Sequence, residues 1–168
     1  MKLQKLNRTL FGALLISGAL GVASQAHALD IDASTLAADG WILNTNYWTT
    51  NNSPAAINES DVETLVGFAG DLGRAYKIDY DTSEEAGTGA MYYSTTFSGE
   101  PNNATISWGG TSYIVCGNCY LVVKDGNAEP DLYVFNISSW NGQDPINLSN
   151  FWNGPQGAIS YVGIYNNY

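Results

Sequence analysis

The sequence predicts a mainly β protein, an antiparallel β-sandwich of jelly-roll or immunoglobulin-like type with one short helix. Short runs alternate between apolar and polar residues, and Gly, Asn and Pro clusters separate them, which is the pattern of sandwich strands joined by turns. The chain also carries 5 Trp, 11 Tyr and 5 Phe. Because disordered chains are poor in aromatic residues, this content predicts a packed core.

The expected strands are short and closely spaced. Residues 120–124 and 132–137 are apolar on both faces, as expected of strands that are covered on both sides. The Gly109-Gly110 pair predicts a tight turn that joins residues 104–108 and 111–115 into a hairpin. The complete set of expected strands is 41–48, 74–80, 91–98, 104–108, 111–115, 120–124, 132–137 and 157–165.

One short helix is expected from residue 60 onward. Ser60 and Glu63 have the spacing of a capping box, in which the serine hydroxyl accepts a hydrogen bond from the glutamate amide. Gly67 and Gly70 then keep the helix short, because glycine weakens a helix interior. The apolar residues at helical spacing are Val62, Leu65, Val66 and Ala69.

Residues 1–28 have the three parts of a secretory signal peptide. The first eight residues carry Lys2, Lys5 and Arg8, residues 9–22 are apolar, and Ala26-His27-Ala28 is a small-x-small cleavage signal. We therefore expect export, with residues 29–168 forming a single β-sandwich domain. A length of 140 residues is a common size for one domain with a real core.

The charge of the expected exported chain excludes several classes of function. Residues 29–168 hold sixteen acidic and three basic side chains, a net charge of −13, and no histidine. The lack of histidine excludes Ser-His-Asp and Cys-His catalysis and zinc sites with imidazole ligands. The lack of clustered Lys and Arg argues against nucleic acid and anionic membrane surfaces as partners. No second long apolar run exists, so no transmembrane segment is expected in 29–168.

Cys116 and Cys119 are expected to form a disulfide, because exported chains meet oxidising conditions. The bond would clamp a tight corner between strands that end near Val115 and begin near Tyr120. A redox-active pair would instead need a helix after the cysteines, and here a strand is expected.

Two acidic segments contain candidate calcium ligands, since hard cations bind several oxygens. The first resembles the opening of a calcium loop, but Glu84 stands where that loop has glycine and Ala90 where it has a bidentate glutamate. The second is a Gly-centred turn. The favoured interpretations are a solvated loop for the first segment and a simple turn for the second. Calcium is a possible cofactor, and no other cofactor is expected. The candidate ligands are Asp79, Asp81 and Glu85, and Asp125, Asn127 and Asp131.

Aromatic residues in polar, Asn-rich surroundings are candidates for carbohydrate binding, because aromatic rings stack on sugar faces. The alternative is that these rings fill the core. No pair of carboxylates stands out for glycoside hydrolysis, so we predict no catalytic residue and no enzyme activity. The candidate carbohydrate-binding residues are Tyr47, Trp48, Trp140 and Trp152.

The second half of the chain resembles the ectodomains of PEP-CTERM sorting-domain proteins, which Gram-negative bacteria export. The motifs that carry the resemblance, within residues 92–165, are CGNCYLVVKDGN (116–127), PDLYVF (130–135), WNG (140–142), LSNFW (148–152) and GAISYVGIY (157–165). Such proteins usually end in a Pro-Glu-Pro motif, an apolar helix and a basic cluster, and this sequence stops at Tyr168 without them. Tyr161 also stands where we expect histidine in the family.

The resemblance implies an exported protein tied to exopolysaccharide, biofilm or floc matrix, without a known catalytic residue. We therefore expect a non-catalytic protein of the extracellular matrix or cell surface of a Gram-negative bacterium. Free secretion is expected rather than retention by a sorting tail, and a periplasmic location is less favoured. The alternatives are a lectin-like carbohydrate-binding module, with or without calcium, and a secreted carbohydrate-active enzyme.

Overall fold

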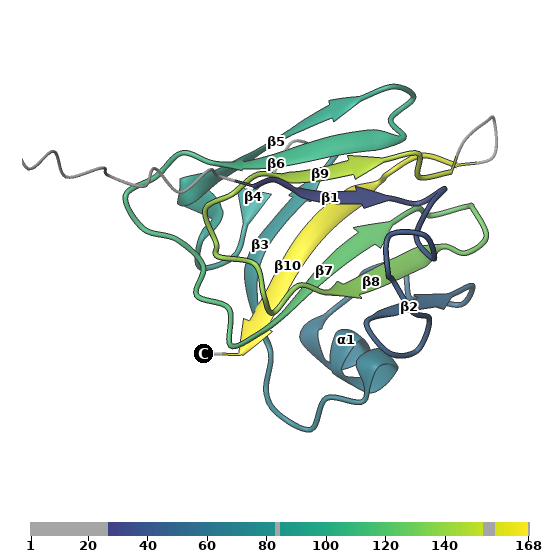
Figure 1. Cartoon of the computed structure of the whole chain (residues 1–168), viewed down its shortest axis with the longest axis horizontal. Helices are drawn as coiled ribbons and strands as arrows, with labels where there is room; N and C mark the ends of the chain where they lie inside the picture. Colours follow the sequence, from purple (N-terminus) through teal and green to yellow (C-terminus); the bar gives the residue numbers. More distant parts are fainter. Residues whose placement is uncertain (1–26, 83–84, 153–156, 168) are drawn as a thin grey trace, which may run out of the picture.

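The computed structural model describes residues 27–82, 85–152 and 157–167. The expected signal peptide lies outside the described residues, except for His27 and Ala28. The described residues form ten β-strands, one α-helix and a short 3-10 helix. The strands make two sheets that face each other, as Figure 1 shows, and the predicted β-sandwich is confirmed. Within this part of the chain, no helix combines the length and the apolar character needed to cross a membrane.

The small sheet has four strands in the order β1-β9-β6-β5. Strand β1 runs parallel to β9, and the other neighbours are antiparallel. The prediction of an antiparallel sandwich therefore holds for every pair except this one. The strands are β1 (Leu29–Asp32), β9 (Ile146–Ser149), β6 (Asn103–Trp108) and β5 (Tyr93–Ser98).

The large sheet has six strands in the order β2-β8-β7-β10-β3-β4, and all of its pairs are antiparallel. Strand β10 lies near its centre, between β7 and β3. The strands are β2 (Tyr47–Thr50), β8 (Leu132–Asn136), β7 (Asn118–Lys124), β10 (Tyr161–Asn167), β3 (Gly73–Asp79) and β4 (Glu85–Ala86).

The main core lies between the two sheets. Alternate side chains of the small sheet point inward, and they include the fully buried Ile31 and Ile106. They pack with buried side chains of the large sheet, such as Leu121, Phe135 and Ile164. Burying a side chain of this size contributes about 1.5–3 kcal/mol relative to leaving it exposed, so this layer supplies most of the driving force for folding.

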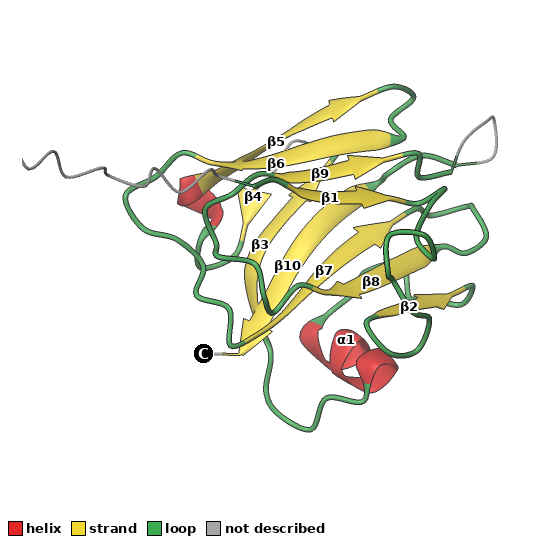
Figure 2. Ribbon diagram, in the orientation of Figure 1, coloured by secondary structure: helices red, strands yellow, loops and turns green. Residues whose placement is uncertain are grey.

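Helix α1 (Glu59–Val66) covers the other face of the large sheet and creates a second core, visible in Figure 2. Val62 of the helix is buried with Val122 of β7 and Tyr165 of β10. The Tyr165 hydroxyl also donates to the carbonyl of Ile57, 3.2 Å away, just before the helix. The large sheet is thus covered on both faces, which confirms the interpretation of residues 120–124 and 132–137.

The helix begins two residues earlier than a Ser60 cap predicts. Asn58 is the N-cap: its side chain accepts from the Asp61 amide at 3.1 Å, and the Asp61 carboxylate accepts from the Asn58 amide at 2.9 Å. Glu63 instead accepts from the amide of Leu72 at 2.6 Å. The Ser60–Glu63 box was therefore wrong, because an equally good capping residue stands two positions upstream.

Four predicted strands need correction, and one of them, expected at residues 157–165, begins only at Tyr161 and runs to Asn167. Residues 111–115 form no strand, and 104–108 pairs instead with β5 through a turn at Gly99, whose φ of 81° suits glycine. Residues 41–46 form a turn with Asn44 at a φ of 58°, and only β2 follows as a strand. Met91 and Tyr92 lie in a 3-10 helix, η1 (Ala90–Tyr92), which precedes β5.

The buried tyrosines predict an alkaline limit to stability. Burial raises the pKa of Tyr76 from 10.0 to about 12. The folded state therefore holds the hydroxyl proton more tightly than the unfolded chain does. The resulting contribution to the free energy of unfolding is fully present below pH 10.0 and is lost as the pH rises through about 12. We expect the free energy of unfolding in urea to fall by roughly 2 kcal/mol over that interval. The free energy of unfolding of the Tyr76→Phe variant should fall less steeply with pH. A profile that stays flat to about pH 12 would contradict the burial of this hydroxyl.

Candidate functional site

A groove of about 580 Å³ opens where the start of β3, the segment before η1 and the end of β10 meet. This volume is within the range of about 300–1,000 Å³ that is typical of small-molecule sites. Its lining combines apolar and hydrogen-bonding residues. The lining residues are Asp71, Leu72, Gly73, Ala75, Thr88, Gly89, Tyr92, Ser112, Tyr113, Ile114 and Asn166.

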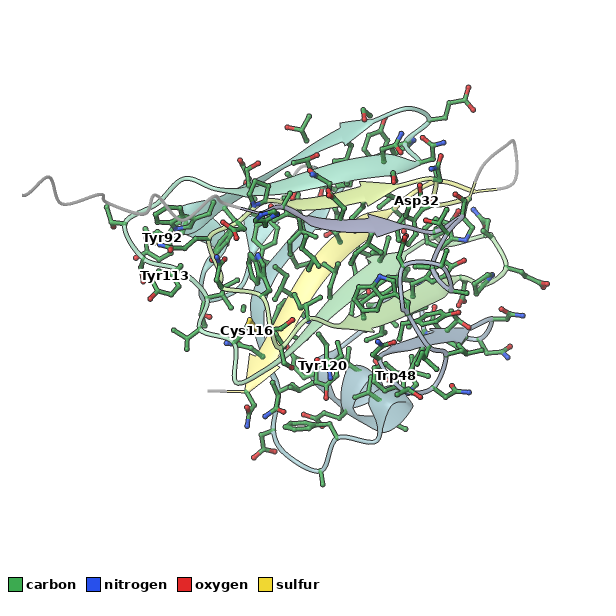
Figure 3. The ribbon with its side chains drawn as sticks, viewed as in Figure 1. Asp32, Trp48, Tyr92, Tyr113, Cys116 and Tyr120 are labelled. Atoms are coloured by element: carbon green, nitrogen blue, oxygen red, sulfur yellow. A yellow bond between two sulfur atoms is a disulfide. The ribbon has the colours of Figure 1, made fainter. Side chains whose placement is uncertain are left out.

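Two tyrosine rings, Tyr92 and Tyr113, come to this groove from different segments and lie on the same side of the molecule in Figure 3. Tyr113 is 46% exposed, and Tyr92 is half-buried. A Cβ atom at Gly110 would lie 2.4 Å from the ring of Tyr92. Gly110 therefore leaves the space in which that ring lies, and a larger residue would displace it.

Residues 109–117, called the wall segment below, form one side of the groove and are held by side chains rather than by a strand ladder. The Trp108 indole donates to the Ser112 carbonyl at 2.7 Å. The buried Tyr93 hydroxyl accepts from the Ile114 amide at 2.8 Å and donates to the Gly142 carbonyl at 2.5 Å. Burial raises the pKa of Tyr93, so this hydroxyl keeps the proton that it donates.

The end of the wall segment is fixed to the large sheet. Cys116 and Cys119 form the predicted disulfide, and Cys119 is a fully buried residue of β7. The Asn166 side chain of β10, itself a lining residue, donates to the Val115 carbonyl at 3.1 Å. The wall segment is thus attached at both ends and in its middle, so the groove is held in shape without a ligand.

The aromatic residues predicted to bind carbohydrate do not line this groove. Tyr47 and Trp48 point to opposite faces of β2. Tyr47 stacks on Phe135 of the main core at 5.8 Å between ring centroids, and Trp48 packs edge-on against Tyr120 in the second core at 6.2 Å. Both rings are half-buried by these contacts.

The other two predicted rings also serve packing. Trp140 is 7% exposed, and its indole donates to the Asp144 carbonyl at 2.8 Å, so the prediction of an exposed platform was wrong for this residue. Trp152 packs against the main core, and its indole donates to the Pro130 carbonyl at 2.6 Å. Both tryptophans therefore fit the alternative interpretation, in which these rings pack in or against the core.

The predicted calcium ligands do not gather in one place. Asp79 is 2.9 Å from the ammonium group of Lys77, Asp81 is exposed, and Glu85 is exposed on β4. Over the ranges that the structure describes, no three His, Cys, Asp or Glu side chains form a group that could hold a metal ion.

The second set of acids fastens loops. Asp125 is buried, and its two carboxylate oxygens accept from the amides of Asn127, at 2.8 Å, and Ala158. Asp131 accepts from the amide of Ser53 at 3.0 Å. The turn interpretation accounts for these contacts, and calcium binding stays a prediction.

Sequence reasoning missed the residues of the groove. Tyr92 was assigned to a strand because its run alternates, Tyr113 because the Gly109-Gly110 pair predicted a hairpin, and Asp71 was not considered. A usable signal was present: residues 111–115 lie between the Gly109-Gly110 pair and the Cys116–Cys119 disulfide, so both ends of this segment are constrained. Aromatic residues in such a fixed loop are better candidates than those in alternating runs.

Comparisons with protein families, curated proteins and solved structures find no match to this chain. The resemblance of residues 92–165 to PEP-CTERM ectodomains therefore stays a prediction.

Tyr93 provides a direct test of how the wall segment is held. In the Tyr93→Phe variant the buried Ile114 amide and Gly142 carbonyl lose their shared partner, which should cost about 1–3 kcal/mol. We expect faster hydrogen exchange in residues 111–115 and a lower free energy of unfolding. Tyr80→Phe, at an exposed tyrosine outside the wall segment, is the matched control and should change neither quantity. Unchanged exchange in Tyr93→Phe would show that other contacts hold the segment.

Proposed function

We propose that this is an exported, non-catalytic protein of the bacterial extracellular matrix or cell surface, and that it contacts polysaccharide through the groove of Tyr92 and Tyr113. The signal-peptide pattern and the resemblance to PEP-CTERM ectodomains support export and a matrix role. The disulfide is compatible with an oxidising compartment outside the cytoplasm.

The groove is the observation that carries the proposal. A sugar ring has apolar faces and a rim of hydroxyls, so its binding sites combine aromatic surfaces with hydrogen-bonding groups. Tyr92 and Tyr113 supply the surfaces, and Asp71, Thr88 and Ser112 supply carboxylate and hydroxyl groups in the same groove. The carbohydrate-binding alternative thus becomes part of the proposal, with contact at the groove instead of at the four predicted rings.

The rigidity of the wall segment supports a binding role. A loop that must be ordered on binding costs about 0.5–1.5 kcal/mol for each immobilised side chain, and a pre-formed site avoids that cost. Here Tyr113 lies on a segment already fixed by Tyr93, Asn166 and the disulfide.

The proposal includes no catalytic step. Glycoside hydrolysis uses two carboxyl groups about 5–10 Å apart on either side of the scissile bond. Within the part of the chain that the structure describes, Asp71 is the single carboxylate that lines the groove. One carboxylate can orient a hydroxyl by hydrogen bonding, which suits a binding role.

The direct experiment is retention of the exported protein on a panel of immobilised polysaccharides, followed by substitution of Tyr113. We expect Tyr113→Ala to weaken binding about fivefold, because a stacked aromatic contact contributes about 1 kcal/mol. Tyr80→Ala is the matched control, since Tyr80 is 45% exposed and Tyr113 is 46% exposed, but only Tyr113 lines the groove.

Retention that falls in Tyr113→Ala and not in Tyr80→Ala supports the groove as the contact site. Equal loss in both variants, or retention on no polysaccharide of the panel, would overturn the proposal. Far-UV circular dichroism of the variants separates loss of contact from loss of fold.

A further inference from the structure

The three basic side chains of residues 29–168 all make contacts within the described part of the protein. Residues 29–168 contain only Arg74, Lys77 and Lys124. A binding protein that recognises carboxylated, sulfated or phosphorylated glycans normally offers Arg or Lys to the anionic groups, because ion-paired hydrogen bonds are the strong ones. The location of these three side chains therefore bears on which polysaccharide can be bound.

Arg74 and Lys77 both lie on strand β3 and belong to its internal packing. The Arg74 guanidinium is 3.6 Å from the Glu59 carboxylate and lies over the Tyr165 ring. The Lys77 ammonium is 2.9 Å from the Asp79 carboxylate and 4.4 Å from the centre of the Tyr161 ring. Neither side chain lines the groove.

Lys124 is buried at the end of β7, with 4% of its surface exposed. Its ammonium group donates to the Ser53 hydroxyl and to the Asp125 carbonyl, the latter at 3.3 Å. Lys124 is thus the least accessible of the three cations, since the Arg74 and Lys77 side chains keep 31% and 17% of their surface exposed.

Among the described residues that line the groove, Asp71 is the one with a charged side chain, and its charge is negative. Asp71 is exposed, lines the groove, and has no ion-pair partner in the described part of the chain. An acidic sugar placed there would meet the Asp71 carboxylate and the field of a net charge of −13 over residues 29–168, and none of the three cations lines the groove. The hydroxyls of an uncharged sugar can donate hydrogen bonds to the same carboxylate.

We propose that the groove selects polysaccharides without acidic groups, and that Asp71 is the residue that sets this selectivity. This inference rests on the proposed function, since it names the class of polysaccharide that the same groove takes.

The test compares matched pairs of polysaccharides that differ only in oxidation at C6. The pairs are a β-1,4-glucan with a β-1,4-polyglucuronate and a β-1,4-mannan with a β-1,4-polymannuronate. Binding of the exported protein is measured in the presence of a chelator, so that calcium does not bridge two carboxylates. In every pair that is bound, we expect the neutral member to bind roughly tenfold more tightly, from the repulsion at Asp71 and the field of the whole chain. The difference should shrink in high salt, which screens exposed charges.

Asp71→Asn tests the role of the single residue. The repulsion between two like charges about 7 Å apart in water weakens binding about threefold. Removing the charge of Asp71 should therefore reduce the ratio of neutral to acidic affinity by about threefold. Glu100→Gln is the matched control. It removes one exposed acid at the turn between β5 and β6, at the far end of the hairpin from Tyr92, and should leave the ratio unchanged.

Tighter binding of an acidic member than of its neutral partner would overturn the inference and leave the proposed function intact. A ratio that narrows equally in Asp71→Asn and Glu100→Gln would overturn the assignment to Asp71. Binding to no member of any pair would contradict the polysaccharide role itself, and the inference with it.

Discussion

The central strands β7 and β10 of the large sheet are buried on both faces, and the other elements are arranged so that both faces are covered. The small sheet covers one face, and helix α1 with Trp48 and Phe68 covers the other. Both the small sheet and helix α1 are needed, because the large sheet would expose apolar surface if either of them were missing. The helix is therefore part of the core, although the chain has only one α-helix in its described part.

The same strand connects the core to the groove. Strand β10 ends at the point where its Asn166 side chain both lines the groove and bonds the wall segment. On the other side, the Tyr93 hydroxyl links the wall segment to the Gly142 carbonyl from within the core. The exposed ring of Tyr113 is thus carried by buried structure. Binding residues on a loop gain their precision from a rigid scaffold in this way.

The parts of the fold that the sequence predicted are those with a strong local pattern. Residues 120–124 carry enough apolar side chains to mark a two-faced strand, and the short spacing of Cys116 and Cys119 marked a local disulfide. Strands β1 and β9 escaped prediction, because each has four residues and their parallel pairing joins segments more than a hundred residues apart. Residues 111–115 follow a Gly-Gly pair and so were predicted as the second strand of a hairpin, but their backbone groups bond to side chains, which no local pattern reveals. The groove depends on such long-range contacts, so its residues were missed.

The central claim is that sugar binds between Tyr92 and Tyr113, and hydrogen exchange with a bound neutral polysaccharide tests it most directly. The account predicts slower exchange confined to the amides of residues 71–75, 88–92 and 112–115. Protection centred on residues 47–50 and 152 would instead place the contact at the tryptophans that were predicted from sequence. That result, or a binding event without protection in the groove, would contradict the account.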